Sequence, residues 1–170
     1  MTVVIPECGT TVIQIQPGAA GSVSCPFGQG FGGPVTVTSD FPVLASQRVQ
    51  YFQSFNEVAA MPSSSAATEL FMPWYDHASS LGFLADNVHV INPTGASENV
   101  TVTIPGCDFA QTGTTGVATL SVAAGGYEIF SCVFGSGFGG PVVITTTGGG
   151  VLASQRVQYF QTFNEAAAAP

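Results

Sequence analysis

The stretch VLASQRVQYFQSFNE (43–57) returns almost unchanged as VLASQRVQYFQTFNE (151–165), and Ser54 against Thr162 is the only difference. Two other pairs of segments precede these copies in the same order. They are CPFGQGFGGPV (25–35) with CVFGSGFGGPV (132–142), and TVVIPEC (2–8) with TVTIPGC (101–107). Because the order is kept throughout, the sequence contains one structural unit twice, which is the signature of a repeat architecture.

The two copies are not equally complete. The second copy is preceded by residues 68–100, and the first copy has no counterpart of that segment. The chain therefore contains the C-terminal portion of the repeated unit twice and its N-terminal portion once. A polymer that exchanged strands between subunits would still supply one N-terminal portion for every two units. The first unit is therefore expected to be a smaller sandwich, to borrow a different strand, or to be truncated.

The hydrophobic pattern is that of β-strands. Val88 and Val90 flank His89, and the segment VTVTI (100–104) alternates strictly. Such alternation in β-branched residues is typical of half-buried strands. Asn-Pro-Thr-Gly (92–95) and several glycine clusters provide turns between the runs. The sequence predicts an all-β protein with two antiparallel immunoglobulin-like β-sandwich units in tandem, the first of them incomplete.

The repeat also predicts the domain boundaries. Residues 1–57 are expected to form a truncated or strand-complemented sandwich, and residues 68–165 a complete one. The segment VAAMPSSSAA (58–67) is small and polar, as linkers often are. Residues 166–170 are expected to be a tail.

Four cysteines occur at matching positions of the two copies, and four cysteines allow three connectivities. Because each unit is expected to close its own bridge, the repeat selects Cys8–Cys25 and Cys107–Cys132. A bridge of this span stabilises a fold by roughly 3 kcal/mol in the chain-entropy description. Two such bridges indicate an oxidising, extracellular or cell-surface location.

Charge is scarce in this chain. Charged residues make up 7% of it, lysine is absent, and Arg48 and Arg156 stand against ten acidic residues for a net charge of −8. Nucleic acid is excluded as a partner because phosphate binding requires a cluster of cations. The sequence contains no apolar run of about 18 residues, so no membrane-spanning helix is predicted. Its start shows no basic region followed by an apolar core, the pattern of a signal peptide.

The two arginines lie mid-strand in the repeated segment. Their aromatic neighbours are Tyr51, Phe52 and Phe55 in the first copy and Tyr159, Phe160 and Phe163 in the second. We predict that each guanidinium stacks on an aromatic ring and pairs with an acid, Glu57 or Glu165. A carbohydrate-binding role for the aromatic side chains is the functional alternative. The predicted arginine–aromatic residues are Arg48, Tyr51 and Phe52 in the first copy, and Arg156, Tyr159 and Phe160 in the second.

Catalytic chemistry has little support. The densest polar group is Asp76, His77, Asp86, Asn87 and His89. Calcium binding through the two aspartates is one interpretation; the favoured one is that Asp76 caps a turn and Asp86 begins a strand. Neither a nucleophile motif nor a clustered metal-ligand motif occurs, so we predict no enzyme activity, cofactor or metal site.

Residues Asn99-Val100-Thr101 form a glycosylation sequon, and Asn99 is therefore a possible glycan site in an extracellular protein.

The second unit resembles the tandem repeats of bacterial cell-surface proteins. Those repeats open with a Trp-Tyr element, contain a strand that ends in Asn-Pro, and close with a strand that holds Val-Ala-x-x-Arg before an aromatic residue. The matching residues here are Trp74-Tyr75, Asn92-Pro93, and Ala153 to Arg156 before Tyr159. The resemblance covers most of residues 71–165, and only its latter part covers 1–57. It implies an extracellular β-sandwich with a scaffold role and no known catalysis.

These observations predict a structural subunit of an extracellular filament, sheath or surface layer. The incomplete first unit would expose unpaired strand edges, which are templates for pairing with another chain. The expected partner is therefore a further copy of the chain, joined by β-strand complementation. The alternative is a cell-surface adhesive or carbohydrate-binding module with glycan partners, and a secreted hydrolase comes third.

Overall fold

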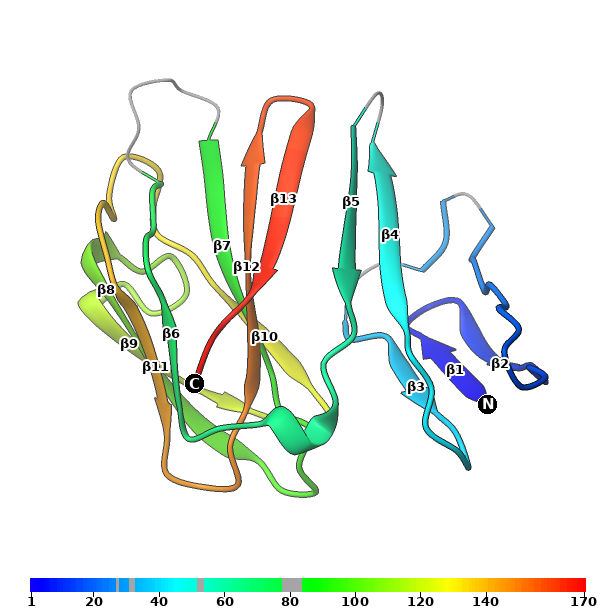
Figure 1. Cartoon of the computed structure of the whole chain (residues 1–170). Coiled ribbons are helices and arrows are strands. Elements are labelled where there is room, and N and C mark those ends of the chain that lie inside the picture. The colour runs from blue at the N-terminus through cyan, green and yellow to red at the C-terminus, as the bar shows by residue number, and fades with distance from the viewer. Residues whose placement is uncertain (27, 31–32, 52–53, 78–83) are drawn as a thin grey trace. The chain divides into compact units, whose positions relative to one another are not determined.

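The computed structural model describes residues 1–26, 28–30, 33–51, 54–77 and 84–170 (Figure 1). It divides into two compact units, Met1–Ala45 and Ser46–Pro170. Within the described residues nearly all regular structure is β-strand, and the strands that pair do so in antiparallel fashion. The all-β prediction is therefore confirmed. The division places residues 46–57, which the repeat had assigned to the first domain, with the second unit.

The first unit contains a single three-stranded sheet in the order β2-β1-β3. Its strands are β1 (Thr2–Ile5), β2 (Gly9–Val12) and β3 (Thr36–Thr38). Among the described residues of this unit, Val3 is the one buried side chain, with 6% of its surface exposed. This unit therefore has one sheet and almost no core.

The second unit contains two four-stranded sheets, β10-β7-β12-β13 and β6-β11-β8-β9. The first is built from β7 (Leu84–Ile91), β10 (Tyr127–Phe130), β12 (Leu152–Tyr159) and β13 (Thr162–Ala167). The second is built from β6 (Glu69–Met72), β8 (Glu98–Asp108), β9 (Thr115–Val122) and β11 (Val142–Thr146). Side chains from both sheets form one buried cluster, so this unit has the two-layer arrangement of a sandwich (Figure 1).

The alternating sequence pattern explains this core. Along β7, Val88 and Val90 are fully buried, whereas the intervening His89 is only half-buried. Strand β8 alternates in the same way up to Ile104. Its register then shifts between Thr103 and Asp108, where Pro105 lacks a backbone N–H donor and Gly106 adopts a φ of 63°.

The remaining strands, β4 (Ser46–Tyr51) and β5 (Ser54–Ala59), form a two-stranded hairpin. The segment expected to be a linker, 58–67, holds the end of β5, a short 3₁₀ helix (Ser63–Ser65) and a bridge from Ala67 to Val151. It is thus hydrogen-bonded to the second unit at its end.

The expected tail, 166–170, is also bound to the sandwich. Strand β13 extends to Ala167. The backbone of Ala169 then exchanges two hydrogen bonds with Phe71 of β6, at 2.7 and 3.1 Å, and Ala168 donates to the carbonyl of Ala153 at 2.9 Å. These bonds connect the end of one sheet to the edge strand of the other.

Matching sequences pair in matching registers. In the first unit Val3 lies opposite Val37. Their counterparts in the repeat, Val102 and Ile144, lie opposite each other between β8 and β11. The sheet β2-β1-β3 thus corresponds to β9-β8-β11 of the second unit. Within the described residues, no helix has the length and hydropathy needed to cross a bilayer.

The repeat offers a matched pair of substitutions that measures this difference between the units. Leu152 is 8% exposed, whereas its counterpart Leu44 is 104% exposed. We expect Leu152→Ala to lower the free energy of unfolding of the second unit by about 2–3 kcal/mol because it removes buried methyl groups. Leu44→Ala should change stability by less than about 0.5 kcal/mol. Chemical denaturation of both variants checks this, and equal effects would contradict it.

Candidate functional site

The cysteines pair as the repeat predicts, with Cys8 bonded to Cys25 and Cys107 bonded to Cys132. In the second unit the bridge is buried in the core, and the backbone N–H of Cys132 donates to the hydroxyl oxygen of Tyr75 at 3.1 Å. In the first unit both cysteines are only partly buried. The same covalent element therefore lies in a closed core in one unit and in an open structure in the other.

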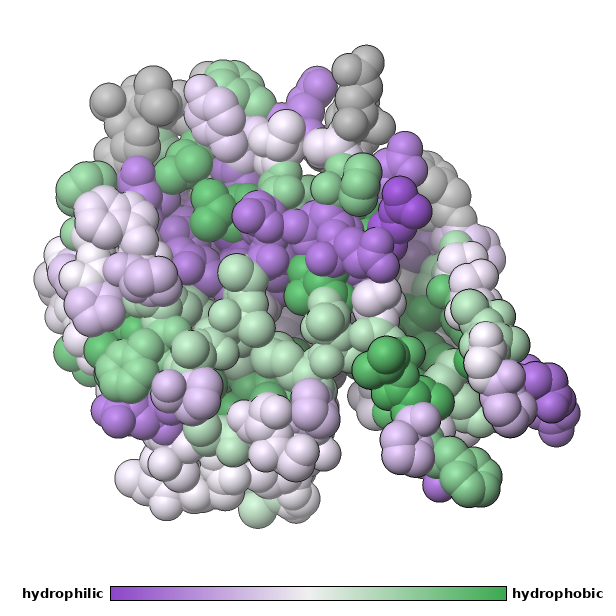
Figure 2. All heavy atoms as spheres, in the orientation of Figure 1, coloured by the Kyte–Doolittle hydropathy of each residue, from purple (hydrophilic) through white to green (hydrophobic). Residues whose placement is uncertain are grey.

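The open side of the first unit is most evident just before β4. Val43 is 44% exposed, whereas its counterpart Val151 is 1% exposed, and Leu44 differs from Leu152 in the same direction. Figure 2 shows hydrophobic side chains at the surface of the molecule. Identical residues that are buried in a complete sandwich are thus presented to solvent in the incomplete one.

The repeated hairpins share the same internal geometry. The hydroxyl of Ser46 donates to Glu57 at 2.8 Å, and that of Ser154 donates to Glu165 at 2.7 Å. The guanidinium carbon of Arg48 lies 4.6 Å from the ring centroid of Phe55. The equivalent Arg156–Phe163 distance is also 4.6 Å. A cation over an aromatic face at this distance is attracted by the ring quadrupole.

The arginine therefore stacks on an aromatic neighbour as predicted, but the ring is Phe55 or Phe163 and not one of those listed as site residues. Tyr159 is three residues from Arg156 along β12 and so points to the opposite face of the strand. Phe160 lies in the turn with a φ of 49°, and Tyr159 and Phe160 pack edge-to-face against each other at 4.7 Å. In the first copy, Phe52 and the side chain of Tyr51 lie outside the described residues.

The acid that was expected to pair with the guanidinium of Arg156 binds another group instead. Arg156 is directly opposite Glu165 in the ladder, but the described residues show no ion pair between them, and Nε of Arg156 is buried without a hydrogen-bond partner. Glu165 accepts from Ser154 instead. Burial lowers the pKa of His89; the nearby Glu165 opposes this shift, and the Arg156 charge adds to it.

The two hairpins meet at equivalent positions. Nδ2 of Asn56 donates to Oδ1 of Asn164 at 2.6 Å, and these asparagines occupy the same place in the repeat. The hydroxyl of Ser54 donates to the carbonyl of Gln161 at 3.2 Å. A contact between matching residues of two copies is the property of an isologous interface.

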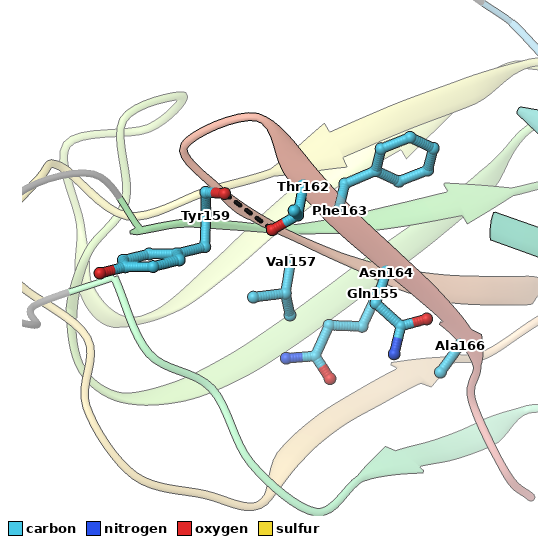
Figure 3. Close-up of a pocket in the computed structure, with 7 residues that line it drawn as sticks. All are labelled: Gln155, Val157, Tyr159, Thr162, Phe163, Asn164 and Ala166. Atoms are coloured by element: carbon cyan, nitrogen blue, oxygen red, sulfur yellow. Dashed lines mark hydrogen bonds between the residues drawn. The ribbon is translucent and has the colours of Figure 1, made fainter. Parts of the chain in front are cut away.

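A groove of about 410 Å³ lies on the β12–β13 hairpin (Figure 3). Gln155 pairs with Val88 in the ladder, so this face continues the face that β7 turns toward the core. The hydroxyl of Thr162 donates to the carbonyl of Tyr159 at 2.8 Å and closes the turn at one end. The lining residues are Gln155, Val157, Tyr159, Thr162, Phe163, Asn164 and Ala166.

Asp86 is the centre of a buried polar network. Its Oδ2 accepts from the backbone N–H of Asp76 at 3.0 Å and from Nε2 of Gln155 at 2.7 Å. Its carbonyl accepts from the hydroxyl of Tyr75 at 2.6 Å, and its N–H donates to Nδ1 of His77 at 3.1 Å. Asp86 lies near the start of β7, as the sequence predicts, and it binds the Trp-Tyr element to that strand.

The network does not assemble all five polar residues singled out from the sequence. Burial raises the pKa of Asp86 to about 6, although its hydrogen bonds and the nearby His77 oppose that shift. His89 alternates with Val88 and Val90 and is directed to the other face of the sheet, near Glu165. Among the described residues, no cluster of three or more His, Cys, Asp or Glu side chains is arranged to hold a metal ion.

Asn99 is exposed in β8, where it lies opposite Ser121 of the edge strand β9. The side chain of the sequon asparagine is therefore accessible in this structure. Glycosylation at this residue remains a prediction.

Comparisons with known proteins give no relative. No family model, no curated protein and no solved structure matches the chain. The resemblance to bacterial surface repeats therefore stays a prediction from the motifs.

The two arginines provide a test of the ring contact. Arg156 is half-buried and Arg48 is exposed. We expect Arg156→Ala to lower the free energy of unfolding by about 1–2 kcal/mol because it removes the contact with Phe163 and the packing of the side-chain stem. Arg48→Ala, the matched control, should cost less than about 0.5 kcal/mol. An unchanged thermal melt together with lost glycan binding would instead make the arginine a ligand-binding residue.

Asp86 predicts a specific pH dependence. Its carboxyl has a pKa of about 6 in the folded protein, against about 3.9 when unfolded. The folded state therefore binds more protons between about pH 4 and pH 6, so this group lowers stability as pH rises through that range. Asp86→Asn removes the titration. The melting temperature of the variant, relative to wild type, should rise from pH 4 to pH 6.5 and level off above; a flat difference would contradict the assignment.

Proposed function

We propose that the protein is a structural subunit of an extracellular filament, sheath or surface layer, assembled by β-strand complementation of its first unit. The observation that carries the proposal is the exposure of Val43 and Leu44, whose counterparts Val151 and Leu152 are buried. Exposed apolar residues of this kind favour association, because each Å² of apolar surface that is buried stabilises the complex by about 25 cal/mol.

The backbone supports the same conclusion. Among the described residues, strand β3 is an edge of its sheet, whereas its counterpart β11 pairs with β6 on that side. An unpaired edge presents free N–H and C=O groups, and the addition of a strand from another molecule is a common mode of assembly.

Two further properties suit an extracellular assembly. The disulfides require an oxidising environment to form and persist. The low content of charged residues, 7%, means that few charges have to be desolvated when subunits pack closely. Its partner is then another copy of the chain.

The groove on the β12–β13 hairpin favours a second function, that of an adhesive carbohydrate-binding module. It combines the aromatic ring of Tyr159 with the amide of Asn164 on an open surface. Aromatic faces and amides are groups that suit the apolar and hydroxyl surfaces of a sugar.

Negative-stain electron microscopy with analytical ultracentrifugation, both without reducing agent, tests the proposal. We expect wild type to sediment as large, regular species. Leu44→Asp should shift the chain to monomers because it places a charge on the open side. Val117→Asp is the matched control, since Val117 is an exposed apolar residue on β9, and it should assemble normally.

Two results would decide against assembly. One is a wild type that stays monomeric over the whole concentration range, and the other is a Leu44→Asp variant that forms the same species as wild type. A monomer that binds on a glycan array, and loses that binding in Tyr159→Ala, would establish the carbohydrate-binding function instead.

A further inference from the structure

A second groove lies in the second unit between the segment that precedes β6 and the last residues of the chain. Its volume is about 470 Å³, and none of its described lining residues carries a charge. Leu70 and Leu152 form its buried part, with 3% and 8% of their surfaces exposed. The rest of the lining consists of alanines, two serines, Met61 and Pro170. We call this surface the alanine groove.

The walls of the alanine groove are held by the backbone. On one side Ala67 exchanges two hydrogen bonds with Val151, at 3.1 and 2.9 Å. On the other side the N–H of Ala168 donates to the carbonyl of Ala153 at 2.9 Å. Alanine side chains are too short to fill the space between these walls. The groove is therefore preformed, and a partner does not have to open it before binding.

The first unit presents an apolar segment that suits this groove. Leu44 is 104% exposed and Phe41 is 80% exposed, and no residue from Phe41 to Gln47 carries a charge. Pro42 fixes its own φ and favours an extended conformation at Phe41. The hydroxyl of Ser39 also donates to the carbonyl of Phe41. The segment therefore loses little conformational freedom when it binds.

We propose that the segment Phe41–Leu44 of one molecule docks in the alanine groove of a second copy, with the Leu44 side chain against Leu70 and Leu152. This inference rests on the proposed assembly and names the surface that covers Leu44. The segment and the groove are different surfaces, so each molecule gives one segment and receives another. A contact of this heterologous kind propagates into an open filament unless its rotation closes a ring.

Charge and volume favour a second copy as the occupant. Each chain has a net charge of −8, so two copies repel each other except where neither surface brings a charge. The alanine groove and the segment both meet that condition. A volume of about 470 Å³ also lies within the range of pockets that enclose a small ligand, roughly 300–1,000 Å³. A small apolar molecule is the alternative occupant, and it would leave Leu44 and Phe41 exposed.

Two neighbouring alanines of β13 provide a matched test by analytical ultracentrifugation of the full chain. Both are exposed, but Ala167 lines the alanine groove and Ala166 lines the groove on the β12–β13 hairpin. We expect Ala167→Arg to stay monomeric at concentrations at least about tenfold above those at which wild type assembles, because the groove offers the guanidinium no partner. Ala166→Arg is the control and should assemble as wild type does.

A mixture of two variants tests the direction of the contact. Leu44→Asp keeps the groove but lacks the segment, whereas Ala167→Arg keeps the segment but lacks the groove. Each variant alone should sediment as a monomer. Their equimolar mixture should give 1:1 dimers that grow no further, and such dimers would also show that both variants are folded. Ser65→Arg, on the other wall of the groove, replaces Ala167→Arg in the same test if that variant does not fold.

The outcomes separate this inference from the proposed assembly. Assembly of Ala167→Arg and Ser65→Arg at the concentrations at which wild type assembles would overturn the docking site and leave the assembly standing. An equimolar mixture that contains monomers alone would overturn the docking site as well. A wild type that is monomeric at every concentration would overturn the assembly, and the docking of a second copy with it.

Discussion

The pairing of strand β7 along both of its edges determines which part of this protein forms a sandwich with a closed core. A β-strand inside a sheet satisfies its backbone groups on both sides, and its neighbours depend on it in the same way. In the second unit β7 has this position, and the core residues Val88 and Val90 lie on it. Where a strand of this kind is missing, segments of the same sequence stay irregular and exposed. The described residues of the first unit contain no counterpart of β7 or of β6, so the contrast between the units follows from two strands rather than from many small differences.

The repeat made the covalent framework and the fold class predictable. Both disulfides follow from cysteines at matching positions, and the strands follow from alternation such as that of residues 100–104. The ring beneath each arginine was not predictable, because it depends on the register of the hairpin turn. Alternation along β12 already directs Tyr159 to the other face, and the register, which pairs Phe163 with Gln158, directs Phe163 to the face of Arg156. Sequence spacing identifies which residues share a strand, but a turn decides which of them meet across it.

Burial was the second property that the repeat could not supply. Arg48 and Arg156 have the same neighbours in sequence and the same distance to a phenylalanine ring, yet one is exposed and the other half-buried. The Asp86 network also depends on tertiary placement, since Tyr75 and Gln155 come from distant segments. A run such as Trp74-Tyr75-Asp76 indicates a polar turn, but nothing in it identifies a buried carboxylate ten residues later as its partner.

The Cys8–Cys25 bridge explains how a unit with one small sheet can remain ordered. A sheet with Val3 as its one buried side chain, among the described residues, has too little core to be stable on apolar burial alone. A bridge across a separation of 17 residues limits the unfolded chain and offsets roughly 3 kcal/mol of that deficit. The loop that it closes contains strand β2. The first unit therefore depends on its disulfide more than the second unit does, because the bridge of the second unit adds to a closed core.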